Sequence, residues 1–200
     1  MTSTRFFVYG SLCEGMVHFS KISNFIETSV FARTKASAYR LKAGLPALVK
    51  EGTDLVAGQL VELKNSDLLI SLLDEFFGFN RQAPDTGLFV REQIEVFPEG
   101  GSQGIKAWAY FMNPLRMPVT ATPIPNGDWQ RSLQEKPSLL SLLTEKQKTY
   151  ITKLGRSIGR EIVPIDLGLY RELMSLELIV DKGRRLALSK LGQEVYKFLP

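Results

Sequence analysis

The chain has 200 residues, of which 44% are hydrophobic and 23% charged, a composition typical of globular proteins with a buried core. Its net charge is +4, and its one cysteine, Cys13, and one histidine, His18, exclude an internal disulfide and offer no cluster with metal-ligand spacing. The first ten residues carry only a short apolar run, so they predict neither a signal peptide nor a membrane span. We therefore expect a cytoplasmic protein without a metal or cofactor.

Five short segments have the alternation or the aromatic content of β-strands. The first, residues 5–8, runs directly into Gly10 and Ser11, which favour a tight turn at its end. The other four are residues 36–41, 55–63, 89–97 and 106–112. Five such strands predict a sheet or a small barrel.

One helix, residues 66–77, is predicted between the third and fourth strands. Ser66 suits its N-cap, and Gly78 suits its C-terminal end. At helical spacing, its apolar stripe consists of Leu69, Leu72, Leu73 and Phe76. We expect this helix to cover an open face of the sheet.

A proline-rich segment follows the last strand. Residues 114–137 contain five prolines and the turn signal Asn126-Gly127, which together predict a linker or a strap lying on the first domain. The sequence therefore divides into a domain at 1–113, this linker or strap at 114–137, and a C-terminal domain at 138–200.

The C-terminal domain differs from the rest in charge and in pattern. Residues 1–137 hold 14 basic and 14 acidic side chains, so 25 − 14 = 11 basic and 21 − 14 = 7 acidic ones remain for residues 138–200. Helical spacing predicts helices at 144–155 and 166–178, then a hairpin that turns at 181–183 and a last helix from about Ser189.

The stretch Phe7-Val8-Tyr9-Gly10-Ser11-Leu12 resembles the FVYGSL/YGTL signature of γ-glutamylcyclotransferase-like (AIG2-like) proteins. Further motifs follow in that family's order, namely Val56-Ala57-Gly58, Leu73-Asp74, Arg91 and Ala107-Trp108-Ala109-Tyr110. The resemblance covers about residues 5–113. It implies an α+β fold, in which a covering helix packs on a small mixed β-barrel.

The resemblance also implies a reaction and a site. In the family, the turn binds the γ-glutamyl part of the substrate, and the glutamate of an LDxxEG motif transfers protons while the α-amine attacks the γ-carbonyl and 5-oxoproline forms. The implied partner is thus a small γ-glutamyl-type ligand. The substrate-binding positions carried over to this chain are Tyr9, Gly10, Ser11, Leu12, Phe77, Arg91 and Tyr110.

Two family positions differ here. Phe77 stands where the family has its catalytic glutamate, and Phe89 stands where it has the tyrosine of a Y-x-R motif. Glu75 is the candidate catalytic residue that remains, although a helix turns its side chain about 200° away from that of Phe77. Arg91 either pairs with a substrate carboxylate or faces water or a neighbouring acid.

Two functions follow from this sequence. The first is an enzyme that forms 5-oxoproline from a γ-glutamyl amine or peptide, or one that performs a related acyl transfer with a displaced carboxylate. The second is a non-catalytic module that binds a small ligand or a protein, and the phenylalanine at position 77 favours it. A nucleophilic role for Cys13 is disfavoured, because no orienting group accompanies His18.

The C-terminal domain resembles a winged-helix domain in its order of elements. Its second helix carries Arg171 against Asp166, Glu172 and Glu177, which argues against reading DNA bases. We therefore expect a helical, winged-helix-like module that contacts a protein partner or a second copy of the chain, rather than nucleic acid.

Overall fold

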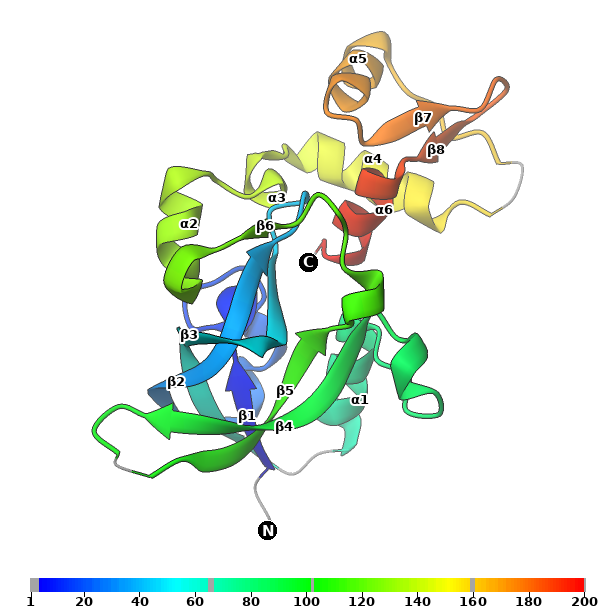
Figure 1. Ribbon diagram of the computed structural model, residues 1–200. Helices are drawn as coiled ribbons and strands as arrows, with labels where there is room; N and C mark the ends of the chain where they lie inside the picture. Colours follow the sequence, from blue (N-terminus) through cyan, green and yellow to red (C-terminus); the bar gives the residue numbers. More distant parts are fainter. Residues whose placement is uncertain (1–3, 65–66, 102, 159–160, 200) are drawn as a thin grey trace. The chain divides into compact units, whose positions relative to one another are not determined.

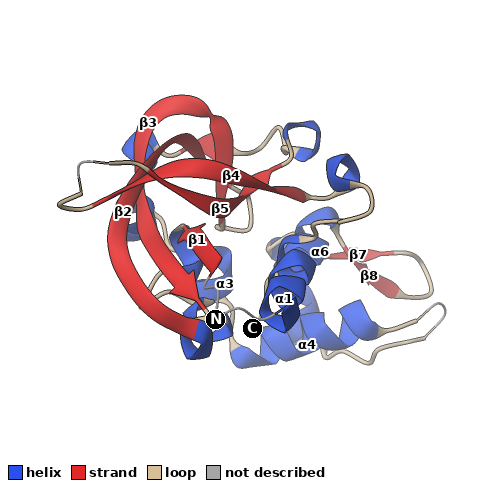
Figure 2. Cartoon of the chain, turned by 90° about the horizontal axis from the view of Figure 1, so that it is seen from below, coloured by secondary structure: helices blue, strands red, loops and turns tan. Residues whose placement is uncertain are grey.

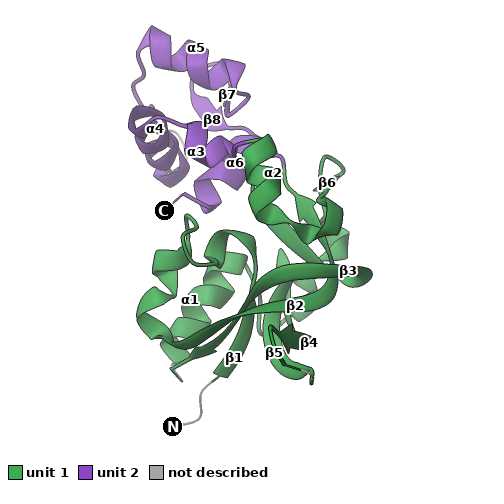
Figure 3. Ribbon diagram, turned by 90° about the vertical axis from the view of Figure 1, so that its left-hand side faces the viewer, with its two compact units in different colours: residues 1–41, 45–136 green, residues 42–44, 137–200 purple. Residues whose placement is uncertain are grey.

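The computed structural model describes residues 4–64, 67–101, 103–158 and 161–199 (Figure 1). These residues form two compact units (Figure 3). Unit 1 comprises residues 1–41 and 45–136, and unit 2 comprises residues 42–44 and 137–200. In the described part of the chain, no helix is both long enough and apolar enough to cross a membrane.

Unit 1 is built on a closed mixed β-barrel (Figure 2). Its strands are β1 (Thr4–Val8), β2 (Ile26–Arg40), β3 (Pro46–Leu63), β4 (Phe89–Pro98) and β5 (Ile105–Met112). They pair in the order β3-β1-β5-β4-β2, and β2 pairs back onto β3 to close the barrel. Only the β1–β5 pair is parallel among these described strands. The predicted α+β fold with a small mixed barrel is confirmed.

Strands β2 and β3 begin well before the predicted residues 36–41 and 55–63. The early part of β2 buries small side chains, Ala32 and Thr34, inside the barrel. Strands are predicted from the alternation of large apolar side chains with polar ones, and these small residues do not give that signal. The long pairing of β2 with β3 supplies the hydrogen bonds that hold this part of the chain extended.

Helix α1 (Asp67–Phe77) follows the third strand as predicted, while Ser66, its predicted N-cap, lies outside the described residues. Leu69 and Leu73 are buried, but Leu72 is 47% exposed, so its place in the predicted stripe is wrong. Each helical residue turns about 100° from the one before it, and Asp74 rather than Leu72 lies beside Leu73 on the buried side.

The barrel interior is the main hydrophobic core. Its buried members come from every long strand and from the segment after β5, namely Phe7, Ala32, Ala36, Ala38, Leu48, Val56, Leu60, Val96, Ala107, Ala109, Phe111, Ile124 and Trp129. Short 3₁₀ turns connect the strands at Gly10–Leu12, Phe19–Lys21, Ser23–Phe25, Pro84–Thr86, Pro114–Arg116 and Pro125–Gly127.

The proline-rich segment packs on the barrel through a short strand and a helix. Strand β6 (Thr122–Pro123) pairs with the end of β2, and helix α2 (Trp129–Glu135) buries Trp129. The guanidinium of Arg40 lies over the Trp129 ring and donates to the carbonyl oxygens of Ser132 and Lys136. These contacts secure the last turn of α2 to the barrel.

Unit 2 contains four helices and one hairpin among its described residues. They are α3 (Leu139–Leu142), α4 (Glu145–Arg156), α5 (Leu167–Ser175), β7 (Ile179–Asp181), β8 (Leu186–Leu188) and α6 (Lys190–Lys197). Thr144 forms a capping box with Gln147 at the start of α4. Helix α5 ends before the predicted Leu178, because Glu177 has a positive φ of 57° that no α-helix continues. The winged-helix likeness stays a prediction.

Candidate functional site

The turn after β1 is built around Gly10, whose φ of +65° lies in the region that favours glycine. A Cβ atom here would lie 2.2 Å from Cγ of Pro46, so a larger residue cannot fit without a shift. Gly10–Leu12 continue as a buried 3₁₀ turn. The path of this turn therefore depends on glycine at position 10.

Tyr9 fastens the turn to the segment that precedes α2. Its hydroxyl donates a hydrogen bond to the carbonyl oxygen of Gly127 over 3.1 Å. Burial, with smaller contributions from Cys13 and Asp128, raises the pKa of Tyr9 well above its ordinary value. The phenol therefore remains a protonated donor, and its hydroxyl is occupied by a structural contact.

Three aromatic rings meet where the turn approaches the end of α1. The Phe77 ring stacks on the Tyr110 ring, with 4.2 Å between their centroids and 13° between their planes. It also lies edge-on to the Phe89 ring, at 5.1 Å and 64°. A cavity of about 30 Å³ remains, lined by Phe6, Phe7, Val8, Tyr9, Leu12, Pro46, Leu48, Leu73, Phe77, Phe89 and Tyr110. We call it the aromatic cavity.

A buried carboxylate, Asp74, lies behind these rings. Its Oδ1 accepts a hydrogen bond from the Tyr110 hydroxyl over 2.6 Å and from Nη1 of Arg91 over 2.8 Å. Its Oδ2 accepts from Nε of Arg81 over 2.5 Å. Burial, followed by the hydrogen bond to Asp74, raises the pKa of Tyr110. Both oxygens of this carboxylate are thus held by donors from the chain itself.

Four of the eight predicted site residues meet at one cavity, whereas Gly10, Ser11, Glu75 and Arg91 are absent from its lining. Tyr9, Leu12, Phe77 and Tyr110 line the aromatic cavity together. Glu75, the candidate catalytic residue, is exposed on α1 and is absent from the cavity lining. The turn of the helix that separates Glu75 from Phe77 explains this difference.

Two environments were expected for Arg91: a substrate carboxylate, or water or a neighbouring acid. The structure shows a neighbouring acid. The Arg91 guanidinium pairs with Asp74 and lies over the rings of Phe79 and Trp108, at 5.1 and 5.5 Å from their centroids. The side chain is only 18% exposed. Its assignment to a substrate carboxylate stays a prediction.

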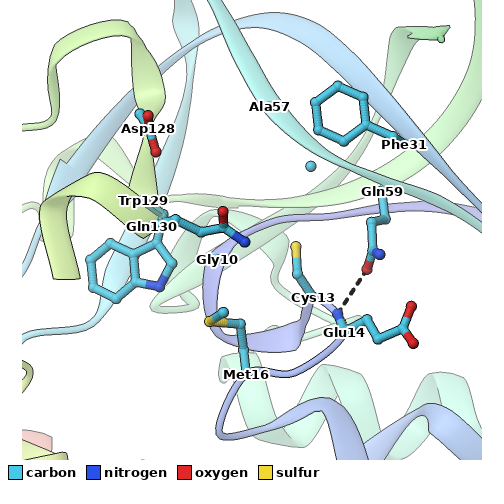
Figure 4. Close-up of a pocket in the computed structure, with 11 residues that line it drawn as sticks. Gly10, Cys13, Glu14, Met16, Phe31, Ala57, Gln59, Asp128, Trp129 and Gln130 are labelled. Carbon is cyan, nitrogen blue, oxygen red and sulfur yellow. Dashed lines mark hydrogen bonds between the residues drawn. The ribbon is translucent and has the colours of Figure 1, made fainter. Parts of the chain in front are cut away.

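A second pocket, of about 140 Å³, borders the same turn (Figure 4). We call it the polar pocket. Its lining residues come from the turn, from β2 and β3, and from the start of α2, namely Gly10, Cys13, Glu14, Met16, Phe31, Ala57, Gly58, Gln59, Asp128, Trp129 and Gln130. Two carboxylates and two carboxamides belong to this lining, and no basic side chain does.

Two side chains of the polar pocket point into a common space. In Figure 4 the Cys13 thiol and the Gln130 amide point toward it, while Glu14 and Asp128 lie on opposite sides of the view. The Gln59 Oε1 accepts a hydrogen bond from the Glu14 backbone N–H over 2.9 Å, which fixes the loop after the turn to β3.

Cys13 is not an activated nucleophile. Burial raises the pKa of its thiol from the ordinary 9.0 to about 12, so the thiol is protonated at neutral pH. Its Sγ lies 3.5 Å from the carbonyl oxygen of Val8. Among the described residues, no group of three His, Cys, Asp or Glu side chains could hold a metal ion.

Several residues of this region escaped the sequence prediction. Asp128, Trp129 and Gln130 lie in the segment predicted as a linker. The prolines of this segment interrupt its periodicity, so the short helix α2 was not predicted. Asp74 was predicted only as part of the Leu73-Asp74 motif, and its burial depends on how α1 is rotated against the barrel. A charged residue at a buried position signals a buried partner.

The closed mixed barrel, whose first strand ends in a glycine turn, is the fold that the resemblance to cyclotransferase-like proteins implies. The chain belongs to the family described as gamma-glutamyl cyclotransferase, AIG2-like, whose model matches residues 6–131. No curated protein matches the chain.

Several solved structures are similar to part of this chain. YkqA from Bacillus subtilis is 26% identical, with a TM-score of 0.50 over 67% of this chain and 42% of YkqA, so the match spans less than half of YkqA. An Arabidopsis thaliana protein is 21% identical, with a TM-score of 0.49 over 68% of this chain and 86% of that protein. An AIG2-like protein from Mus musculus is 16% identical, with a TM-score of 0.42 over 60% of this chain and 82% of that protein.

Proposed function

We propose that this chain is a small-ligand-binding member of the gamma-glutamyl cyclotransferase family that does not form 5-oxoproline. One observation carries the proposal. The Phe77 ring stacks on Tyr110 at the position where the family resemblance expects the catalytic glutamate. A phenyl ring neither accepts nor donates the protons that cyclisation requires.

The neighbouring acids do not replace that glutamate. Asp74 is the carboxylate nearest in sequence to Phe77 on the buried side of α1, but both its oxygens already accept hydrogen bonds from Tyr110, Arg91 and Arg81. These donors belong to the chain itself and occupy the oxygens that a substrate proton would need to reach. Glu75 is exposed.

The ligand of this proposal occupies the polar pocket, since the aromatic cavity has room for about one water molecule. Glu14 and Asp128 give the polar pocket a negative charge that no lining cation offsets. This environment favours a ligand with an ammonium group, such as the α-ammonium of a γ-glutamyl amine or peptide. Met16 offers apolar surface to its body.

The test combines binding with turnover. Thermal shift and calorimetry with γ-glutamylmethylamide, which has no second carboxylate, and with a small alkylamine measure binding, and chromatography measures 5-oxoproline release. We expect binding without release in the wild type, and several-fold weaker binding in Glu14→Gln and Asp128→Asn. Asparagine still accepts the Arg131 N–H that Asp128 caps, so the second variant removes charge and keeps the start of α2.

An enzyme that uses Glu75 is the second candidate, because Glu75 is the remaining acid of the helix end. Release of 5-oxoproline by the wild type that disappears in Glu75→Gln would establish the enzyme and refute our proposal. Release of 5-oxoproline by Phe77→Glu but not by the wild type would support our proposal, since it would show that the wild type lacks only the proton-transferring group at position 77.

A further inference from the structure

The outer side of β2 carries a row of three exposed side chains. Phe31, Arg33 and Lys35 alternate along the strand with the buried Ala32 and Thr34. Successive side chains of a strand point to opposite faces, so the three lie together on the outside of the barrel.

The neighbouring strands place apolar side chains beside this row. Arg33 is in register with Phe97 of β4, and Lys35 is in register with Leu55 of β3. Phe31 is 41% exposed and Leu55 is 50% exposed. Together these side chains border an open groove of about 550 Å³, lined by Phe31, Arg33, Lys35, Leu55, Phe97, Pro98 and Glu99.

The groove has an excess of positive charge. Arg33 and Lys35 line it against one acid, Glu99. The Arg33 guanidinium lies 5.7 Å from the centroid of the Phe31 ring. Within the part of the chain that the structure describes, neither cation forms an ion pair within 4 Å. Both cations are therefore available to anions from outside.

The spacing of the row selects the kind of anion. Residues two apart on a strand are separated by about 6.6 Å, which is also the repeat of an extended peptide. A second chain running along β2 can thus present a carboxylate to each cation and an apolar side chain to Phe31. A small molecule with one anionic head group would engage only one cation.

We propose that this groove binds an extended acidic segment of a partner protein, in which two carboxylates and one apolar side chain occupy successive alternating positions. The groove adjoins the polar pocket through Phe31, which lines both. The proposal depends on neither ligand binding nor turnover in that pocket, because its charge contacts are made by Arg33 and Lys35, which line the groove and are absent from the pocket lining. Charge complementarity sets the sequence preference, and the exposed Phe31 and Leu55 add apolar contact.

Fluorescence anisotropy with a labelled peptide, Phe-Ser-Glu-Ser-Glu, tests the proposal on the full chain. We expect binding at about 0.05 M salt that weakens at about 0.3 M, because exposed ion pairs are screened. Arg33→Gln and Lys35→Gln should each weaken binding about threefold. Leu55→Ser should weaken it as well, whereas Lys64→Gln, an exposed cation outside the groove, should leave it unchanged.

Three outcomes would overturn the proposal. The first is equal binding of Phe-Ser-Lys-Ser-Lys, and the second is unchanged binding in the Arg33→Gln/Lys35→Gln double variant. The third is binding of dodecanoate without binding of the acidic peptide, which would assign the groove to a small amphipathic anion. Because every substituted side chain is exposed, melting temperatures within about 2 °C of the wild type should accompany each variant.

Discussion

The Phe77 ring lies flat against the Tyr110 ring, with 4.2 Å between centroids, while the Tyr110 hydroxyl donates to the buried Asp74. One tyrosine thus joins the aromatic cavity to the charged cluster behind it. The end of α1 is held on the barrel by a ring stack on one side and by a hydrogen-bonded carboxylate on the other. This arrangement makes separate predictions for each side.

Removing the ring should destabilise unit 1. We expect Phe77→Ala to lower the free energy of unfolding by about 2–3 kcal/mol, because removing the ring leaves a void between Tyr110 and Phe89. The loss is smaller than for a fully buried phenylalanine, since Phe77 is only partly buried. Leu72→Ala, on the exposed side of the same helix, should change it by less than about 0.5 kcal/mol. Urea unfolding followed by tryptophan fluorescence reports on unit 1, since Trp108 and Trp129 both lie there. Equal effects of the two variants would refute the packing role of Phe77.

Removing the buried charge should cost a similar amount. Asp74→Asn leaves the half-buried Arg91 without its acid, and we expect a loss of about 2–4 kcal/mol in unfolding free energy. Glu75→Gln, one residue further on the exposed side, is the matched control and should be nearly neutral. The same fluorescence-monitored unfolding measures both. A larger loss in Glu75→Gln than in Asp74→Asn would contradict the assignment of the buried carboxylate.

The turn should tolerate a methyl group at one glycine and not at another. Gly10→Ala requires a positive φ and brings Cβ to 2.2 Å from Pro46, so we expect a loss of at least about 2 kcal/mol. Gly15→Ala has a similar φ of 78° with nothing within 4 Å, and should cost about 1 kcal/mol. Thermal unfolding of both variants separates the steric cost from the conformational one. Similar losses would show that Pro46 moves aside.

The Cys13 thiol should react slowly. Because burial raises its pKa to about 12, iodoacetamide at pH 8 should alkylate it at least about 100-fold more slowly in the folded protein than in the unfolded chain. The rate should still climb at pH 10, where an unperturbed thiol has reached its plateau. Early saturation near pH 9 would refute the raised pKa.

The same shift has a consequence for stability at high pH. Because the pKa of Cys13 is higher in the folded state than in the unfolded chain, the folded state binds the thiol proton more tightly. This contribution to the free energy of unfolding is complete below about pH 9 and is lost as the pH rises toward about 12. Unfolding free energies measured between these limits should fall, and they should fall less steeply in Cys13→Ser, whose hydroxyl does not titrate in this range. Parallel curves for the two proteins would contradict this linkage.

Local sequence signals determined much of this protein. The apolar run before Gly10 and the alternation in residues 89–97 and 106–112 predict three strands close to their observed bounds, because these strands bury large side chains at period two. The N-cap residues Thr144, Asp166 and Ser189 likewise mark helix starts, since capping is a contact within a few residues. The family motif at residues 7–12 predicted the mixed barrel.

Tertiary structure decided the site. Whether Asp74 or Glu75 enters the buried cluster depends on how α1 is rotated against β5, which brings in Tyr110, 36 residues later. Similarly, Asp128 to Gln130 line the polar pocket in a segment that contacts the barrel through residues far away in sequence, such as Tyr9, which bonds to Gly127 across 118 residues. Contacts at such separations leave no periodic trace in either segment, since each side chain's partner is fixed by packing. The glycine turn could therefore be predicted from the sequence, whereas the two cavities that border it could not.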